Sequence, residues 1–316
     1  MNFRTIINLG KGDFELNPEK PLMLLGSCFS DNIGNKLKSS LWDTAVNPCG
    51  VLYNPASIAA IISRAINNDL INDADIVSSN NRYLSWLFDS HYSSVNKATA
   101  LKKMNDALAL TAKYLNNISC LLITFGTAWI YELADSRQIV GNCHKFPSNY
   151  FCRRRMSVNE IADLWISLIT RLQTLNPDLK IIFTVSPIRH FKDGAHENSL
   201  SKSTLMLAID RIISETHHTD YFPAYELLID DLRDYRFYAD DMLHPSKIAI
   251  DYIWQRFGEK YFSNKTIDII TRATKLHQRL HHRPLTDDIS QIEKFNQETE
   301  RLTTEFITAH PYMQRL

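Results

Sequence analysis

The chain alternates short apolar runs with longer stretches in which apolar residues recur at helical spacing. The short runs, which predict buried strands, are residues 22–25, 44–46, 83–88, 121–125, 181–185 and 221–224. The apolar positions of residues 161–172 and 205–213 follow the period of an α-helix, and Ser157 with Glu160 forms a capping box before the first. Asn54-Pro55 has the cap and first-turn residues of a further helix. This alternation predicts an α/β fold, with a mostly parallel sheet covered by helices on both faces.

The sequence becomes polar and helix-rich after Gly258. Ile289, Ile292 and Phe295 are spaced for an amphipathic helix in this part of the chain. We therefore expect residues 1–258 to form the α/β core and residues 259–316 to form a C-terminal helical extension. The extension either packs on the core or makes a homodimer through its helices.

The overall charge argues against two classes of partner. Thirty-five basic residues balance thirty-five acidic ones, so no global field favours nucleic acid or an anionic membrane. The only dense basic cluster, residues 153–155, is expected to be a solvated loop before a helix. The amino terminus lacks the apolar segment of a signal peptide, and no run of about 18 apolar residues could span a membrane. These features predict a soluble protein in the cytoplasm, and the five cysteines, with no C-x-x-C pair, predict no disulfide framework.

A candidate nucleophile follows the first apolar run. Gly26-Ser27-Cys28-Phe29-Ser30 comes directly after residues 22–25. Parallel α/β proteins present reactive groups beyond the carboxyl end of a strand, where ligands bind. Far downstream, Asp241 and His244 lie three residues apart. A nucleophile, a base and a group that orients the base are the parts that acyl transfer requires.

In this chain order the sequence resembles the SGNH/GDSL hydrolases, and within them the GSCFA family. Residues 25–34 carry the signature from which that family takes its name, with Ser30 where the name has Ala. Five more segments also resemble the family: residues 50–55, 125–129, 141–145, 186–190 and 234–239. The resemblance covers roughly residues 20–260 and implies a flavodoxin-like, three-layer parallel sheet of the SGNH-hydrolase type. It also implies an acyl-ester hydrolase or acyltransferase, acting on a small-molecule or glycan ester without a cofactor.

Alignment with the Gly-Asp-Ser-Leu pattern of the superfamily puts Cys28 at the nucleophile position. A thiol is a better nucleophile than a hydroxyl at neutral pH, and a helix amino terminus would raise its thiolate fraction. Ser27 as the nucleophile is a second interpretation. In a third, Cys28 is a small buried residue and Ser27 is only a helix cap.

His244 matches the superfamily's base, and Asp241 matches the residue that orients its imidazole. Pro245 would then occupy the first position of the following helix. Asp240 could replace Asp241 if the turn were one residue longer. His190, at the end of another predicted strand, is a rival base.

The expected oxyanion hole departs from the superfamily pattern. Where the superfamily has Gly-x-Asn-Asp, this chain has Gly126-Thr127-Ala128-Trp129, and Ala128 has no side-chain donor. Losing such a donor lowers turnover on the order of 10² to 10³ if nothing replaces it. The candidate replacements, besides the amide of Gly126, are the amide of Gly50 and side chains of Thr127, Asn47 and Asn142.

The segment Gly141-Asn142-Cys143-His144-Lys145 is expected to form a wall of the pocket and not a metal site, because it has no tight pair of ligands. The main alternative to an enzyme is a noncatalytic module that binds a glycan, peptide or anionic metabolite, and Ala128 favours it. A nucleotide-binding function is disfavoured because no Gly-x-Gly-x-x-Gly or Walker-type loop follows a predicted strand.

Overall fold

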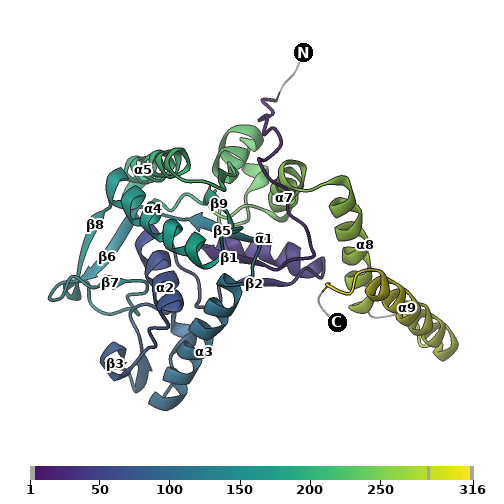
Figure 1. Ribbon diagram of the computed structural model, residues 1–316, viewed down its shortest axis with the longest axis horizontal. Coiled ribbons are helices and arrows are strands. Elements are labelled where there is room, and N and C mark those ends of the chain that lie inside the picture. Colours follow the sequence, from purple (N-terminus) through teal and green to yellow (C-terminus); the bar gives the residue numbers. More distant parts are fainter. Residues whose placement is uncertain (1–3, 283–284, 314–316) are drawn as a thin grey trace.

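The computed structural model describes residues 4–282 and 285–313, and its centre is a parallel sheet of five strands (Figure 1). These strands are β1 (Leu22–Gly26), β2 (Thr44–Val46), β5 (Cys120–Phe125), β9 (Lys180–Val185) and β10 (Thr219–Tyr221). Their order in the sheet is β10-β9-β5-β1-β2, and every pair is parallel. Numbered along the chain, this is the flavodoxin-like order 2-1-3-4-5. The predicted flavodoxin-like parallel sheet is confirmed.

Helices cover both faces of this sheet. They are α1 (Cys28–Ser39), α2 (Pro55–Asn67), α3 (Lys97–Leu115), α4 (Val158–Leu175), α5 (Gly194–Glu215), α6 (Ala224–Glu226) and α7 (Lys247–Tyr261). Two further helices, α8 (Asn264–Leu280) and α9 (Ile289–Ala309), do not cover the sheet: α8 packs against α1, and α9 packs against α8. Successive residues of a strand point to opposite faces. Met23 and Leu25 therefore pack in one core with α2, α3, α4 and α5, while Leu22 and Leu24 pack in the other with α1 and α7. The result is a three-layer α/β/α core.

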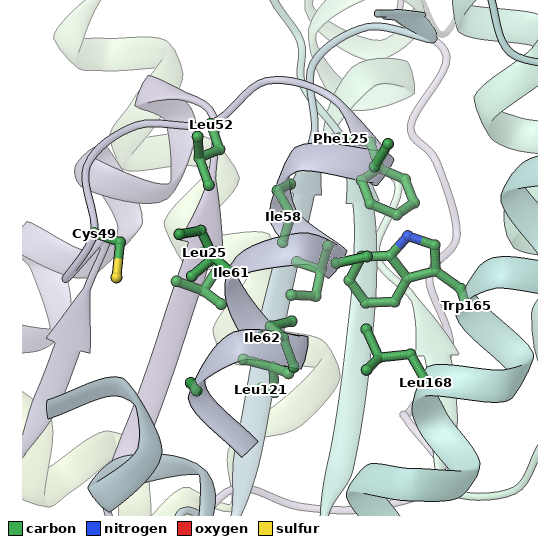
Figure 2. Close-up of a cluster of buried hydrophobic side chains, with 14 of the residues drawn as sticks. Leu25, Cys49, Leu52, Ile58, Ile61, Ile62, Leu121, Phe125, Trp165 and Leu168 are labelled. Atoms are coloured by element: carbon green, nitrogen blue, oxygen red, sulfur yellow. The ribbon is translucent and has the colours of Figure 1, made fainter. Parts of the chain in front are cut away.

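Trp165 of α4 anchors the larger core. Its ring centroid lies 5.2 Å from that of Phe125 and 5.3 Å from that of Phe183, and its indole N–H donates to the Pro55 carbonyl at 3.3 Å. Figure 2 shows this side chain beside the isoleucines that α2 directs into the same layer. The capping box of Ser157 and Glu160 starts α4 as predicted.

Two of the predicted strands differ from the structure. Residues 83–88 do not join the central sheet: β4 (Arg82–Leu84) forms an antiparallel hairpin with β3 (Val77–Ser79), and Tyr83 also bridges to Ser94. Residues 222–224 leave β10, and α6 begins at Ala224.

The residues after β5 form a second sheet that was not predicted. It contains β6 (Trp129–Leu133), β7 (Ile139–Val140) and β8 (Phe151–Arg155), all antiparallel. The expectation of a solvated basic loop at residues 153–155 is wrong, because these arginines lie in β8 and each has a carboxylate partner. Arg153 pairs with Asp193, Arg154 with Glu132 and Arg155 with Glu197.

The chain leaves the core through α7 and ends in α8 and α9. Ser246, not Pro245, caps α7, so Pro245 precedes the helix instead of starting it. Phe306 of α9 packs on α8, and Figure 1 shows this pair at the end of the molecule opposite β6–β8. None of the helices in residues 4–282 and 285–313 is long and apolar enough to cross a membrane.

Candidate active site

Cys28 is the first residue of α1 and follows β1 by one residue. The connection is tight, since Gly26 has a φ of +137° and a Cβ there would lie 2.2 Å from the Thr124 carbonyl oxygen. Ser27 caps the helix: its Oγ accepts the Phe29 N–H at 3.3 Å. Ser27 is only 1 % exposed, whereas Cys28 is half-buried. The thiol, and not the Ser27 hydroxyl, is therefore the group that a ligand can reach.

Opposing effects act on the Cys28 thiol. Burial raises its pKa, and the charge of Asp31 on the next turn of α1 raises it further. The backbone N–H groups of Cys28 and Phe29, at the amino end of the helix, and the charge of Lys202 lower it. Burial dominates, so the free thiol is less acidic than an exposed one.

Asn47 connects Asp31 to the strand that precedes Cys28. Its Oδ1 accepts the Gly26 N–H at 2.9 Å, and its Nδ2 donates to Asp31 Oδ1 at 2.8 Å. Burial raises the pKa of Asp31. Because the Asn47 amide already bonds to two groups, its geometry favours a supporting role over that of an oxyanion donor.

Asp241 and His244 form a compact unit before α7. Asp241 Oδ1 accepts the backbone N–H groups of Leu243 and His244, both at 2.9 Å, and its Oδ2 lies 2.5 Å from His244 Nδ1. These bonds lower the pKa of Asp241 to about 2. A carboxylate can only accept, so Nδ1 carries the proton and Nε2 of a neutral His244 is the acceptor nitrogen. This is the tautomer that a general base requires, and Asp241 occupies the orienting position, not Asp240.

His190 lies beside His244. Their ring centroids are 6.4 Å apart and nearly perpendicular, and the ring of Tyr53 meets the edge of His190 at 6.3 Å. Burial, followed by the charges of Lys202 and His244, lowers the pKa of His190. His190 is thus a neutral imidazole between Tyr53 and His244, and its position keeps it as a rival base.

Most of the predicted oxyanion donors are occupied by backbone acceptors. The N–H groups of Gly126 and Thr127 both donate to the Tyr53 carbonyl, at 2.7 and 3.0 Å, and the Gly50 N–H donates to the backbone carbonyl of Asn47 at 2.8 Å. The Thr127 hydroxyl lies 3.1 Å from Ser201 Oγ and accepts the Trp129 N–H. These groups would have to exchange partners before they could bind an oxyanion.

Three other donors have no acceptor among the described residues. They are the Cys28 backbone N–H and the side-chain amide nitrogens of Asn54 and Asn142. Asn54 uses only its Oδ1 to cap α2, which leaves Nδ2 available. The sequence marks Asn54 as a helix cap, and nothing in it shows that this residue also lines a pocket.

A pocket of about 400 Å³ is lined by Asn54 and Asn142 among other residues, and Cys28 is not one of its lining residues. Tyr53, Asn54 and Gly126 line one side of it, and its other walls include Trp129, Tyr131, Val140, Asn142, Cys143, Arg153 and His190. A second hollow, of about 280 Å³, is lined by Arg189, Phe191, Tyr235, Tyr238, Met242 and Leu243. Residues 189–193 separate the two: Arg189 and Phe191 face the second hollow, and His190 and Lys192 face the first.

His144 does not line the pocket. Its Nε2 lies 2.9 Å from the Ser85 carbonyl and its Nδ1 3.1 Å from Ser90 Oγ, so Nε2 donates and Nδ1 accepts from the hydroxyl. Burial lowers its pKa. Gly141, Asn142 and Cys143 do line the pocket, while His144 holds their loop in place. Within residues 4–282 and 285–313, no group of three or more His, Cys, Asp or Glu side chains could hold a metal ion.

Sequence reasoning overlooked Lys202 of α5. This side chain is only 2 % exposed, and its Nζ donates to the carbonyls of Gly126 and Ser186, both at 2.8 Å. A signal was present, since Lys202 lies three residues before Leu205 on the apolar stripe of its helix. A lysine on such a stripe is buried, and burial without a carboxylate partner lowers its pKa to about 7.

The solved structures that are similar to this chain include three carbohydrate esterases. A family 2 enzyme with a carbohydrate-binding domain, from Corynascus thermopiles (Myceliophthora fergusii), is 10 % identical with a TM-score of 0.40, over 80 % of this chain and 67 % of that one. The acetyl xylan esterase Est2A of Butyrivibrio proteoclasticus is 10 % identical with a TM-score of 0.40, and the match covers 76 % of this chain and 63 % of the esterase. The family 3 carbohydrate esterase of Clostridium thermocellum is 11 % identical with a TM-score of 0.37, and the match covers 80 % of this chain and 97 % of the esterase.

This chain thus spans about two thirds of the length of the first two enzymes. A search of curated proteins found no match. The model of the GSCFA family matches residues 21–257, which is well over half of the sequence. The chain belongs to the GSCFA family.

Proposed function

We propose that the protein is an acyl-ester hydrolase in which Cys28 is the nucleophile, His244 the base and Asp241 the residue that orients it. The observation that carries the proposal is the pairing of Asp241 with His244 Nδ1, which leaves Nε2 as the proton acceptor. Cys28 is placed at the carboxyl edge of β1, where a flavodoxin-like sheet binds ligands. His190 lies between the rings of Tyr53 and His244, and the pKa of Tyr53 is raised by burial and then by the charge of Cys28.

In the proposed reaction, Cys28 Sγ attacks the ester carbonyl carbon as His244 Nε2 takes the thiol proton. A tetrahedral oxyanion forms, and its collapse breaks the bond to the alcohol oxygen, which leaves with the proton from His244. Water, deprotonated by His244, then attacks the thioester and releases the carboxylic acid and the thiol. If a second alcohol replaces water, the same site is an acyltransferase.

The available donors suit this reaction. The Cys28 N–H is at the amino end of α1, where the helix dipole favours negative charge. Asn54 lines the adjoining pocket, and its Nδ2 would replace the side-chain donor that Ala128 lacks. The substrate is an O-acyl ester of a sugar or small metabolite, its two parts occupying the hollows on either side of residues 189–193.

The second candidate function is ligand binding without catalysis. The observation that favours it is the engagement of the Gly50, Gly126 and Thr127 amides by backbone carbonyls, together with Ala128. In this case the pocket would bind the same ester or a related ligand but would form no covalent intermediate.

Short-chain p-nitrophenyl esters and thioesters test the two candidates. The hydrolase should release p-nitrophenol and show an acyl adduct on the Cys28 peptide by mass spectrometry, and Cys28→Ala should abolish both. Cys143→Ala is the matched control, because Cys143 is also a half-buried thiol and lines the pocket. An adduct that persists in Cys28→Ala, or the absence of turnover and adduct in the folded wild-type protein, would refute the hydrolase.

A further inference from the structure

Three arginines line the two hollows of the site, and one of them has no carboxylate partner in the described part of the chain. Arg153 pairs with Asp193 at 2.6 Å, and Arg233 lies 3.7 Å from Asp230. Arg189 lines the second hollow, is half-buried and bonds only to uncharged side chains. A partly buried cation without a counter-ion is destabilised, so the folded state alone does not account for this guanidinium.

The guanidinium of Arg189 is held along one edge and open along the other. Its Nη2 donates to Ser199 Oγ at 3.0 Å, and its Nε donates to Asn198 Oδ1 at 3.5 Å, both on α5. The N–H groups of Nη1 and the second N–H of Nη2 have no acceptor among the described residues. Such a pair of N–H groups binds a carboxylate or a phosphate through two parallel hydrogen bonds. Arg189 is therefore oriented by α5 with its anion-binding edge unoccupied.

The second hollow adjoins the proposed base. Met242 and Leu243, the two residues before His244, form part of its wall. Tyr238 forms another part, and its phenol, which has no hydrogen-bond partner among the described residues, offers a further donor. In the proposed reaction His244 returns its proton to the leaving alcohol oxygen. The alcohol part of the ester therefore belongs on this side of the site.

The walls of the second hollow carry an excess of positive charge. Arg189 and Arg233 line it, and Asp234 is the one acidic side chain among its described lining residues. Asp234 Oδ2 lies 3.7 Å from Arg236 Nε, and Arg233 has Asp230 as its partner. With these partners included, three arginines stand against two aspartates, and Arg189 is the cation left over. The hollow thus favours a ligand with a negative charge.

Building on the hydrolase function, we propose that the substrate is an ester of an anionic alcohol, and that Arg189 binds the carboxylate or phosphate group of this alcohol in the second hollow. The open edge of the guanidinium holds the charged group, and the rings of Phe191 and Tyr238 lie beside the rest of the alcohol. The ester oxygen is then next to His244, and the acyl part occupies the first pocket.

Matched acetyl esters test this preference. 4-Acetoxybenzoate and 4-acetoxyphenyl phosphate carry the anion on the alcohol part, and 4-acetoxybenzamide is the neutral counterpart. Release of the phenol gives kcat/KM for each ester, and the readout is the ratio of the anionic ester to the neutral one. Arg189→Met should lower this ratio by about 10- to 100-fold, the effect of hydrogen bonds to a charged group. The anionic ester with the larger ratio distinguishes carboxylate from phosphate.

Two further variants locate the effect. Arg189→Lys keeps the charge but cannot form two parallel hydrogen bonds, so its ratio should lie between those of the wild type and Arg189→Met. Lys192→Met is the matched control, because Lys192 is a cation that lines the first pocket instead of the second. It should keep the wild-type ratio.

Binding of the free alcohols tests the same contact without turnover. In Cys28→Ala, titration calorimetry should show that 4-hydroxybenzoate or 4-hydroxyphenyl phosphate binds more tightly than 4-hydroxybenzamide. The double variant Cys28→Ala/Arg189→Met should lose this difference. Preferential binding of the anion by a protein that hydrolyses none of the esters would support the role of Arg189 and count against the hydrolase alone.

Every outcome decides the inference. Equal ratios in the wild type and in folded Arg189→Met would overturn it, and so would loss of the preference in Lys192→Met, which would put the anion in the first pocket. Arg189→Lys decides if Arg189→Met does not fold. If neither folds, the wild type decides: a preference for the anionic compounds that weakens with added salt supports the inference, and no preference in turnover or binding contradicts it.

Discussion

Replacing Ser27 by Ala separates the two candidate nucleophiles by stability as well as by chemistry. The Ser27 hydroxyl satisfies the Phe29 N–H, and both residues are almost fully buried. Loss of an N-cap bond costs about 0.5–2 kcal/mol. Since water cannot replace the hydroxyl here, we expect a loss near the upper end, about 2 kcal/mol. Alkylation and acylation of Cys28 should remain.

Ser157→Ala is the matched control for this change. Ser157 caps α4 through the Glu160 N–H at 3.2 Å, but at an exposed position where water can take over the bond. We expect Ser157→Ala to lower the free energy of unfolding by about 0.5–1 kcal/mol. Urea unfolding followed by circular dichroism gives both free energies, and mass spectrometry of the acyl adduct gives the chemistry. Equal losses in the two variants would refute the reasoning from burial. A folded Ser27→Ala protein without an adduct would show that Ser27, and not Cys28, is the nucleophile.

Four further predictions follow from the geometry. Asp241→Asn should lower ester turnover by roughly 10²–10⁴, since the imidazole loses its orienting acceptor; an unchanged kcat would exclude this role. In the wild type, the lowered pKa of Asp241 means that its contribution to stability is complete above about pH 4 and is lost as the pH falls through about 2, which acid titration by circular dichroism would detect. Gly26→Ala should destabilise the fold by about 4 kcal/mol, because strain at the positive φ costs about 1–3 kcal/mol and overlap with Thr124 costs about 1–3 kcal/mol more. A variant that unfolds thermally at the same temperature as the wild type would contradict this prediction. A homodimer through α8 and α9 should have twice the monomer mass in light scattering. Ile289→Lys, on the exposed face of α9, should dissociate this dimer, whereas Phe306 packs on α8 within one chain and is not a suitable position for the test. A monomeric wild type would contradict the expectation.

The parts of the fold that could be predicted are those with a local cause. Five of the six apolar runs contribute strands to the central sheet, and the Ser157 capping box starts a helix, because each depends on neighbouring residues. The pairing of Asp241 with His244 is also local, since one turn brings them together.

The parts that could not be predicted depend on distant contacts. Pairing of β6 with β8 joins residues about 20 positions apart, and no periodicity in the arginines of β8 reveals it. The Gly126 and Thr127 amides are occupied because the Tyr53 carbonyl, far away in sequence, lies opposite them. Lys202 is an intermediate case: its place on the apolar stripe predicts burial, but only the three-dimensional structure shows which carbonyls it holds.

The sheet of β6, β7 and β8 has a consequence for engineering. Trp129, Tyr131, Val140 and Arg153 of the pocket come from this sheet, whereas Cys28, His190 and His244 follow elements of the parallel core or precede α7. The residues that would choose a substrate and those that would react with it thus belong to separate units of the chain. Residues 129–155 form one continuous insertion between β5 and α4, so a library confined to this segment could vary the ligand preference while the reacting groups stay unchanged.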